Sequence, residues 1–129
     1  MSVLVDSSVW IAAAHPKNQE CLALQRLIRK NELIHVIRPV QVEVCQGARS
    51  PEEFHKLWDA FLGFSFLEVN DAHWGKAAWN FFTCRKRGIT LSTLDCLIGT
   101  IAAEYRVPLW SVDRIFEKAQ PVLKFDLFQ

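Results

Sequence analysis

The segment SVLVD, residues 2–6, decides the fold of this chain, because three consecutive apolar residues end at a carboxylate, Asp6. A short apolar run without alternation predicts a strand that is buried on both faces, as in a parallel sheet. A second run of this kind, PLWSV at residues 108–112, also ends at an aspartate, Asp113. The two segments together predict a parallel sheet whose strands end in acidic side chains.

Between these two strands, further apolar runs alternate with helical patterns. Helices begin and end at recognisable signals: Ser50-Pro51 supplies an N-cap and an N1 proline with Glu53 at N3, and Gly88 ends a long helix. This alternation predicts an α/β domain with a mostly parallel sheet of four to five strands. The predicted strands are 2–5, 33–37, 64–69, 108–112 and a short last one at 122–125, and the predicted helices are 7–14, 18–31, one from 51 onward, 71–87 and 92–106. Residues 39–44 fit a strand and a helix equally well.

Length and composition predict one globular domain spanning residues 1–129, since half of the residues are hydrophobic and 22% are charged. The 15 Lys and Arg residues against 14 Asp and Glu residues exclude a strongly basic nucleic-acid binder. Asp6 interrupts the apolar start, and no apolar run reaches the ~18 residues of a membrane span. We therefore expect a cytoplasmic protein without a membrane segment. The four cysteines form no C-x-x-C pair and are expected to be buried free thiols.

Three aspartates are predicted to approach one another in this fold. Ligand sites of parallel sheets lie outside the carboxyl ends of the strands, where Asp6 and Asp113 both fall, and Asp95 lies in the first turn of a helix. Several carboxylates in one crevice cannot all ionise unless a cation compensates them. Hard oxygen ligands favour Mg²⁺ or Mn²⁺ over zinc.

Each acid also has a purely structural interpretation. Asp6 and Asp113 could cap the helices that follow them, and Asp95 could complete a capping box with Ser92. Glu43 could be a solvated surface acid. Spacing alone leaves the catalytic and the structural interpretation open.

Three motifs and one further acid resemble the PIN-domain ribonucleases, and among them the VapC-type toxins of bacterial toxin–antitoxin pairs. Residues 3–11, VLVDSSVWI, resemble the opening of that family, residues 94–102, LDCLIGTIA, are similar to its third acidic motif, and residues 109–116, LWSVDRIF, to its fourth. Glu43, followed by Gly47, lies where the family has its second acid. The resemblance spans residues 3 to 125 and implies a PIN-like three-layer α/β/α sandwich.

The resemblance also implies a chemistry. Mg²⁺ or Mn²⁺ would activate a water molecule to cleave RNA endonucleolytically, leaving 5′-phosphate and 3′-hydroxyl ends. By resemblance, the residues around Glu43 would be helical. Ile115 departs from the family, in which many members have a further aspartate at that position, so the resemblance does not imply a second metal that depends on that acid. The implied metal-binding and catalytic acids are Asp6, Glu43, Asp95 and Asp113, supported by the hydroxyls of Ser7 and Ser111.

Partners are implied as well: a VapB-type antitoxin, an RNA substrate and a second copy of the chain in a homodimer. Most of the five tryptophans are expected in the core, and the remainder at a dimer face or an antitoxin groove. The antitoxin's disordered tail would place a basic side chain against the acids. Arg85, Lys86 and Arg87 could contact the RNA backbone or simply suit a helix C-terminus. Arg114 could contact a phosphate or pair with a nearby acid.

Other protein classes fit less well. A receiver domain needs an acidic pair after the first strand, and a dehalogenase-like phosphatase needs an aspartate two residues after Asp6, where Ser8 stands. A PIN fold without catalytic activity, used as a binding module, is the alternative that leaves the fold unchanged.

Overall fold

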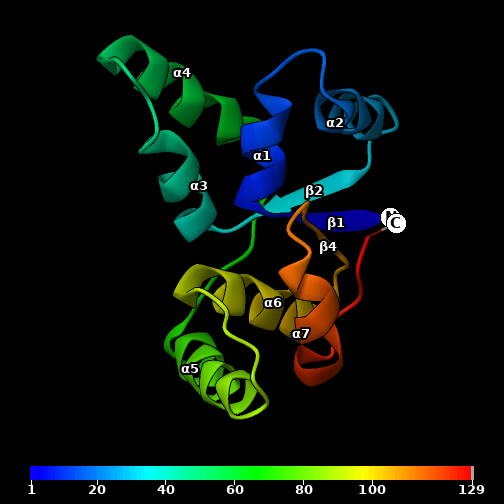
Figure 1. Cartoon of the computed structure of the whole chain (residues 1–129). Coiled ribbons are helices and arrows are strands. Elements are labelled where there is room, and N and C mark those ends of the chain that lie inside the picture. Colours follow the sequence, from blue (N-terminus) through cyan, green and yellow to red (C-terminus); the bar gives the residue numbers. More distant parts are fainter. Residues whose placement is uncertain (129) are drawn as a thin grey trace.

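A four-stranded parallel sheet lies at the centre of the computed structural model, which describes residues 1–128 (Figure 1). The strand order is β3-β2-β1-β4, so the first and last strands of the chain are neighbours, as the two acid-ended segments require. All three strand pairs are parallel. The strands are β1 (Ser2–Val5), β2 (Leu33–Val36), β3 (Ser65–Phe66) and β4 (Leu109–Trp110).

Helices cover both faces of this sheet, which confirms the predicted three-layer α/β/α sandwich. Figure 1 shows α1 to α4 on one side of the strands and α5 to α7 on the other. The first layer contains α1 (Ser7–Ala13), α2 (Gln19–Arg29), α3 (Arg38–Cys45) and α4 (Pro51–Ala60), which continues into a 3₁₀ turn, η1 (Phe61–Gly63). The second layer contains α5 (Asp71–Lys86), α6 (Thr93–Tyr105) and α7 (Ile115–Leu123).

Burial on both faces explains why β1 lacks an alternating pattern. Val3 and Val5 pack on one side with Leu24 of α2. Leu4 points to the other side, into the cluster that contains Ile101 of α6. Each residue of this strand is therefore removed from water by one of the two helical layers, and the apolar run before Asp6 fixes the strand at the centre of the molecule.

The ambiguous segment after β2 is the helix α3, as the family resemblance implies. Pro39 lies in its first turn, and Val40 is buried while Val42 is exposed. The alternation of valines is therefore no sign of a strand here, because only part of the apolar set faces the core.

The predicted last strand at 122–125 is wrong. α7 continues to Leu123 and ends at Lys124, whose φ of 61° is left-handed. The chain then returns to the sheet at Leu127, which forms an isolated parallel bridge with Leu109. The apolar residues of this segment face the core from a helix end, which sequence pattern alone cannot distinguish from a buried strand.

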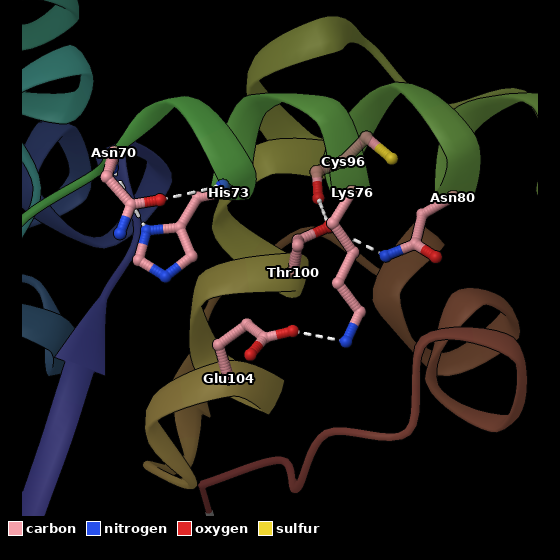
Figure 2. Close-up of polar contacts among 7 residues, drawn as sticks. All are labelled: Asn70, His73, Lys76, Asn80, Cys96, Thr100 and Glu104. Carbon is pink, nitrogen blue, oxygen red and sulfur yellow. Dashed lines mark hydrogen bonds and ion pairs between the residues drawn. The ribbon is translucent and has the colours of Figure 1, made fainter.

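Polar contacts fasten α5 to α6 in the second layer (Figure 2). Asn70 and His73 form a reciprocal capping box at the start of α5, which sequence analysis missed because histidine is an unusual partner in that position. Further along the pair of helices, the Asn80 amide donates to Thr100 Oγ1 at 2.9 Å, and Lys76 forms an ion pair with Glu104.

The distribution of tryptophans differs from the expectation. Trp58, Trp74 and Trp79 are all at least one-third exposed, so the prediction that most tryptophans lie in the core is wrong. Cysteines follow the prediction more closely: all four are free, and three are buried while Cys21 is half-buried. None of the helices formed by residues 1–128 has the length and hydrophobicity for a membrane crossing.

Candidate active site

Asp6 is the most buried acid at the carboxyl ends of the strands, with only 2% of its surface exposed. Its backbone N–H donates to the carbonyl of Trp110 at 2.9 Å, which extends the pairing of β1 with β4 by one residue. Asp6 occupies the N-cap position of α1, but its carboxylate makes no cap hydrogen bond to that helix. The capping interpretation therefore does not account for this side chain.

Two serine hydroxyls, rather than the N–H groups of α1, are the hydrogen-bond donors to the Asp6 carboxylate. Ser8 Oγ donates to Asp6 Oδ2 at 2.7 Å, and Ser111 Oγ donates to the same oxygen at 2.8 Å. The two hydroxyl oxygens in turn accept the backbone N–H groups of Val112 at 3.1 Å and Asp113 at 3.0 Å. Each hydroxyl thus uses its single proton on the carboxylate and a lone pair on the loop after β4. This network ties the orientation of Asp6 to the position of Asp113.

Ser8 is a functional candidate that sequence analysis missed. Ser7 was predicted to support the acids, yet its hydroxyl lies 3.5 Å from Asp6 Oδ1, a longer contact than that of Ser8. Both serines lie in the first turn of α1. The choice between them depends on which way the carboxylate faces, and Ser111, directly after β4, sets that direction.

Asp95 lies in the first turn of α6, where Ser92 Oγ accepts its backbone N–H at 3.0 Å. Burial raises the pKa of this carboxyl to about 6, and the negative charge of Asp6 is the next largest cause. The Ser92 hydroxyl offsets part of the increase in pKa. Ser92 thus caps α6 through the Asp95 N–H, as the structural interpretation requires. The Asp95 carboxylate is nevertheless close enough to Asp6 for the charge of Asp6 to raise its pKa.

Glu43 and Asp113 add their charges to the same region, since both also raise the pKa of Asp95. Glu43 is half-buried on α3. Asp113 is exposed after β4, and its Oδ1 accepts the N–H of Ile115 at 3.0 Å, so it also supports the start of α7. The charges of the three other acids that the sequence singled out thus all act on the carboxyl of Asp95.

The donor set suits a hard divalent cation. Its members are carboxylates and hydroxyls, and the ion pairs formed by residues 1–128 leave the four acids without a basic partner. Accumulated negative charge of this kind favours binding of a cation. Within the same residues, no three acidic, histidine or cysteine side chains converge into a formed metal cluster. The four acids therefore share one end of the sheet without forming a closed set of ligands.

Three of the four basic residues singled out by sequence have local partners. Arg85 lies over the ring of Phe81 and Lys86 over that of Phe82, at 6.0 and 5.4 Å from the ring centres. Arg114 pairs with Glu117 at 3.5 Å on the surface. The pairing of Arg114 agrees with its structural interpretation, and Arg85 and Lys86 lie in the last turn of α5, as theirs requires. Contact of these residues with RNA stays a prediction.

A sequence model described as the PIN domain matches residues 3–120 of the chain. No curated protein matches the sequence significantly.

Several solved structures have the same fold, and one of them, VapBC-5, is described as a member of the VapBC family of toxin–antitoxin systems. VapBC2 from Rickettsia felis, bound to a DNA fragment from its promoter, superposes with a TM-score of 0.79 at 16% identity over 100% of both chains. FitAcB from Neisseria gonorrhoeae superposes with a TM-score of 0.68 at 13% identity, and the alignment covers 98% of this chain and 96% of that one. VapBC-5 from Mycobacterium tuberculosis superposes with a TM-score of 0.72 at 15% identity, and the alignment covers 99% of this chain and 98% of that one. At these identities the likeness shows the fold.

Proposed function

This chain belongs to the PIN domain family, and from that premise we propose that it is a metal-dependent endoribonuclease that acts as the toxin of a toxin–antitoxin pair in the cytoplasm. The observation that supports the proposal is the raised pKa of Asp95, which burial causes first and to which the charges of Asp6, Asp113 and Glu43 all add. A merely structural set of acids would be expected to have basic partners, because uncompensated like charges destabilise a fold.

Asp6, Glu43, Asp95 and Asp113 would hold Mg²⁺ or Mn²⁺, which when bound would activate water and neutralise the charge that develops on the phosphate. Asp6 is the central ligand in this proposal, because two hydroxyls fix one of its oxygens and leave the other largely free. Ser8 and Ser111 act as positioning residues. Asp95 is oriented by the capped start of α6. Burial and then the charge of Asp6 raise its pKa, and the same negative charge of Asp6 would favour a bound cation.

RNA cleavage is the direct test. The purified protein should cut single-stranded RNA in the presence of Mg²⁺ or Mn²⁺, EDTA should stop the reaction, and the products should carry 5′-phosphates. Asp6→Asn and Asp95→Asn should abolish cleavage while circular dichroism shows an intact fold. Full activity in either variant would sink the assignment, and a folded wild-type protein without cleavage under any metal would favour the inactive binding module.

The toxin role requires a partner protein, and α4 offers a surface for the proposed VapB-type antitoxin. No residue of α4 is buried, and the rings of Phe54 and Trp58 stack on its exposed side. Leu62 in η1 extends this apolar stripe and is 76% exposed. Exposed apolar patches of this kind are common at protein interfaces.

Expression in cells tests the toxin role separately from the chemistry. Production of the chain alone should arrest growth, and co-production of the small protein encoded beside it should relieve the arrest. Replacing Trp58 and Leu62 together by lysine should weaken that relief. Growth arrest by the Asp95→Asn variant would contradict RNA cleavage as the toxic activity.

A homodimer is the remaining part of the proposal and follows from the resemblance to toxins that dimerise. Sedimentation velocity should show a dimer at micromolar concentrations. A monomer at high micromolar concentration, both alone and with the antitoxin, would exclude it.

A further inference from the structure

A groove leads away from the acids between α3 and the start of α5. It consists of two adjoining cavities of about 470 and 480 Å³ that share Arg38, Pro39 and Trp74 as lining residues. One cavity reaches Glu43 and Leu94, the neighbour of Asp95. The groove therefore opens directly beside the proposed cleavage site.

Trp74 supplies a flat apolar surface in this groove. It lies in the second turn of α5, and 45% of its surface is exposed. Among residues 1–128, no other aromatic ring packs against it in a stacked or edge-on arrangement, unlike the rings of Trp10, Trp58, Trp79 and Trp110. An exposed indole at a site for nucleic acid is a natural platform for a base.

Arg38 is a fixed cation in the same groove. Its guanidinium lies 3.7 Å from the centre of the Phe66 ring, and Nη1 donates to Gln41 Oε1 at 2.8 Å. Gln41 is itself fully buried, so the acceptor cannot move away. None of the ion pairs within residues 1–128 involves Arg38. The guanidinium is thus oriented without being neutralised, and its remaining N–H groups are free to bind an anion.

An indole face next to an oriented guanidinium matches the two parts of a nucleotide, the base and the phosphate. We propose that this groove binds one nucleotide of single-stranded RNA adjacent to the cleaved phosphodiester, with its base stacked on Trp74 and its phosphate on Arg38. The proposal rests on the proposed ribonuclease function and adds the substrate subsite. Glu68 lines the far end of the groove and would repel a further phosphate, so one nucleotide is the expected occupancy.

Binding of a short fluorescein-labelled single-stranded RNA by the Asp95→Asn protein, followed by anisotropy with Mg²⁺ held constant, tests the subsite. Adding Trp74→Ala should weaken binding roughly tenfold, as for loss of one base-stacking contact. Adding Arg38→Gln should also weaken it and lower the slope of log K against log salt by about 0.7, the value for one phosphate contact with a single strand.

Trp79→Ala is the matched control, because Trp79 is more exposed than Trp74 on the same helix and lines none of the groove. It should leave RNA affinity unchanged. RNAs with an abasic site at successive positions should identify one position at which Trp74→Ala has no further effect. Trp74→Phe, which keeps an aromatic face, should retain most of the affinity.

Equal affinities of the Trp74→Ala and Trp79→Ala proteins would overturn the subsite, as would a Trp74 effect that no abasic position removes. A change of oligomeric state in Trp74→Ala with unchanged RNA affinity would overturn it too, because the groove would then bind protein. If the wild-type protein cleaves RNA in any of these cases, the ribonuclease function stands and only the subsite fails. If neither cleavage nor RNA binding is found, both fail.

Discussion

At the scale of single residues, the hydroxyls around Asp6 hold one carboxylate oxygen and so orient the other one for a ligand. Ser8 and Ser111 both donate to Asp6 Oδ2, so this oxygen is satisfied within the protein and Oδ1 faces a much longer contact. A carboxylate held in this way presents one oxygen to an incoming cation with little freedom to rotate. Residues that orient metal ligands commonly affect activity nearly as much as the ligands themselves.

Ser111→Ala should therefore lower the RNA cleavage rate about 10- to 100-fold, the usual effect of removing a group that orients a ligand. The variant also loses the acceptor for the Asp113 N–H, so both acids are released together. Ser7→Ala, which removes only the 3.5 Å contact, should have a smaller effect. The measurement is the cleavage rate at saturating metal and RNA, and equal losses in the two variants would contradict the assigned geometry.

The raised pKa of Asp95 predicts that the stability of the protein depends on pH. Its pKa in the folded protein is raised from 3.8 to about 6, so between these values the folded state binds more protons than the unfolded state. The stabilising contribution is complete below pH 4 and is lost as pH rises to about 6. Without added metal, the free energy of unfolding of Asp95→Asn minus that of the wild type should therefore increase over this interval. A pH-independent difference in urea unfolding would refute the shared-charge interpretation.

At the scale of elements, two helical glycines have opposite surroundings. A methyl group at Gly75 in α5 would meet no heavy atom within 4 Å, whereas at Gly99 in α6 it would lie 2.8 Å from Leu123 Cδ1. Gly99 is the position at which α6 contacts the end of α7, and Leu123 is buried there.

Gly75→Ala should stabilise the protein by about 0.8–1.0 kcal/mol, the difference in helix propensity between the two residues. Gly99→Ala gains the same propensity but must displace a buried leucine, which typically costs about 1–3 kcal/mol. We expect it to be neutral or destabilising. Chemical unfolding of both variants tests the comparison, and equal stabilisation would show that α6 and α7 are not packed closely at this point.

The elements that sequence analysis predicted correctly are those with strong local signals. β1 follows from its apolar run, and α4 from Ser50, whose hydroxyl accepts the N–H of Glu53 as predicted. α3 could be assigned only through the resemblance, because Val40 and Val42 look alike in sequence and differ only in burial by the rest of the fold.

In the site, too, the residues with a local sequence signal were predicted and the others were not. Asp6, Asp95 and Asp113 were recognisable because they follow a strand or begin a helix, whereas Glu43, in the second half of α3, was recognisable only through the order of acids in a known family. Ser8, Trp74 and Arg38 were not, because their importance depends on neighbours that are distant in sequence: Ser8 meets Ser111, and Arg38 stacks on Phe66. A local pattern contains no information about such contacts.

At the scale of the whole molecule, the near-neutral charge conceals an uneven distribution. Four of the 14 acids meet at one end of the sheet, which leaves ten acids against 15 basic residues elsewhere. A bound divalent cation would offset part of this negative charge and so weaken the repulsion of an RNA phosphate. The balance of charges therefore excludes a generic basic RNA binder and is compatible with a metal-dependent nuclease.

Metal binding should accordingly stabilise the entire fold. A cation that binds only the folded state raises the unfolding temperature, by roughly 10 °C at metal concentrations about 100 times Kd for a domain of this size. Mn²⁺ or Mg²⁺ should produce this rise in the wild type. Asp95→Asn should start from a higher unfolding temperature without metal, because it removes the repelled charge, and should gain little from the metal.

Glu104→Gln is the matched control: it loses the surface ion pair with Lys76, away from the four acids, and should keep the full response to metal. Differential scanning calorimetry with increasing metal measures all three proteins. An equal rise in wild type and Asp95→Asn would place the metal elsewhere on the molecule and remove the basis for assigning these four acids to its binding.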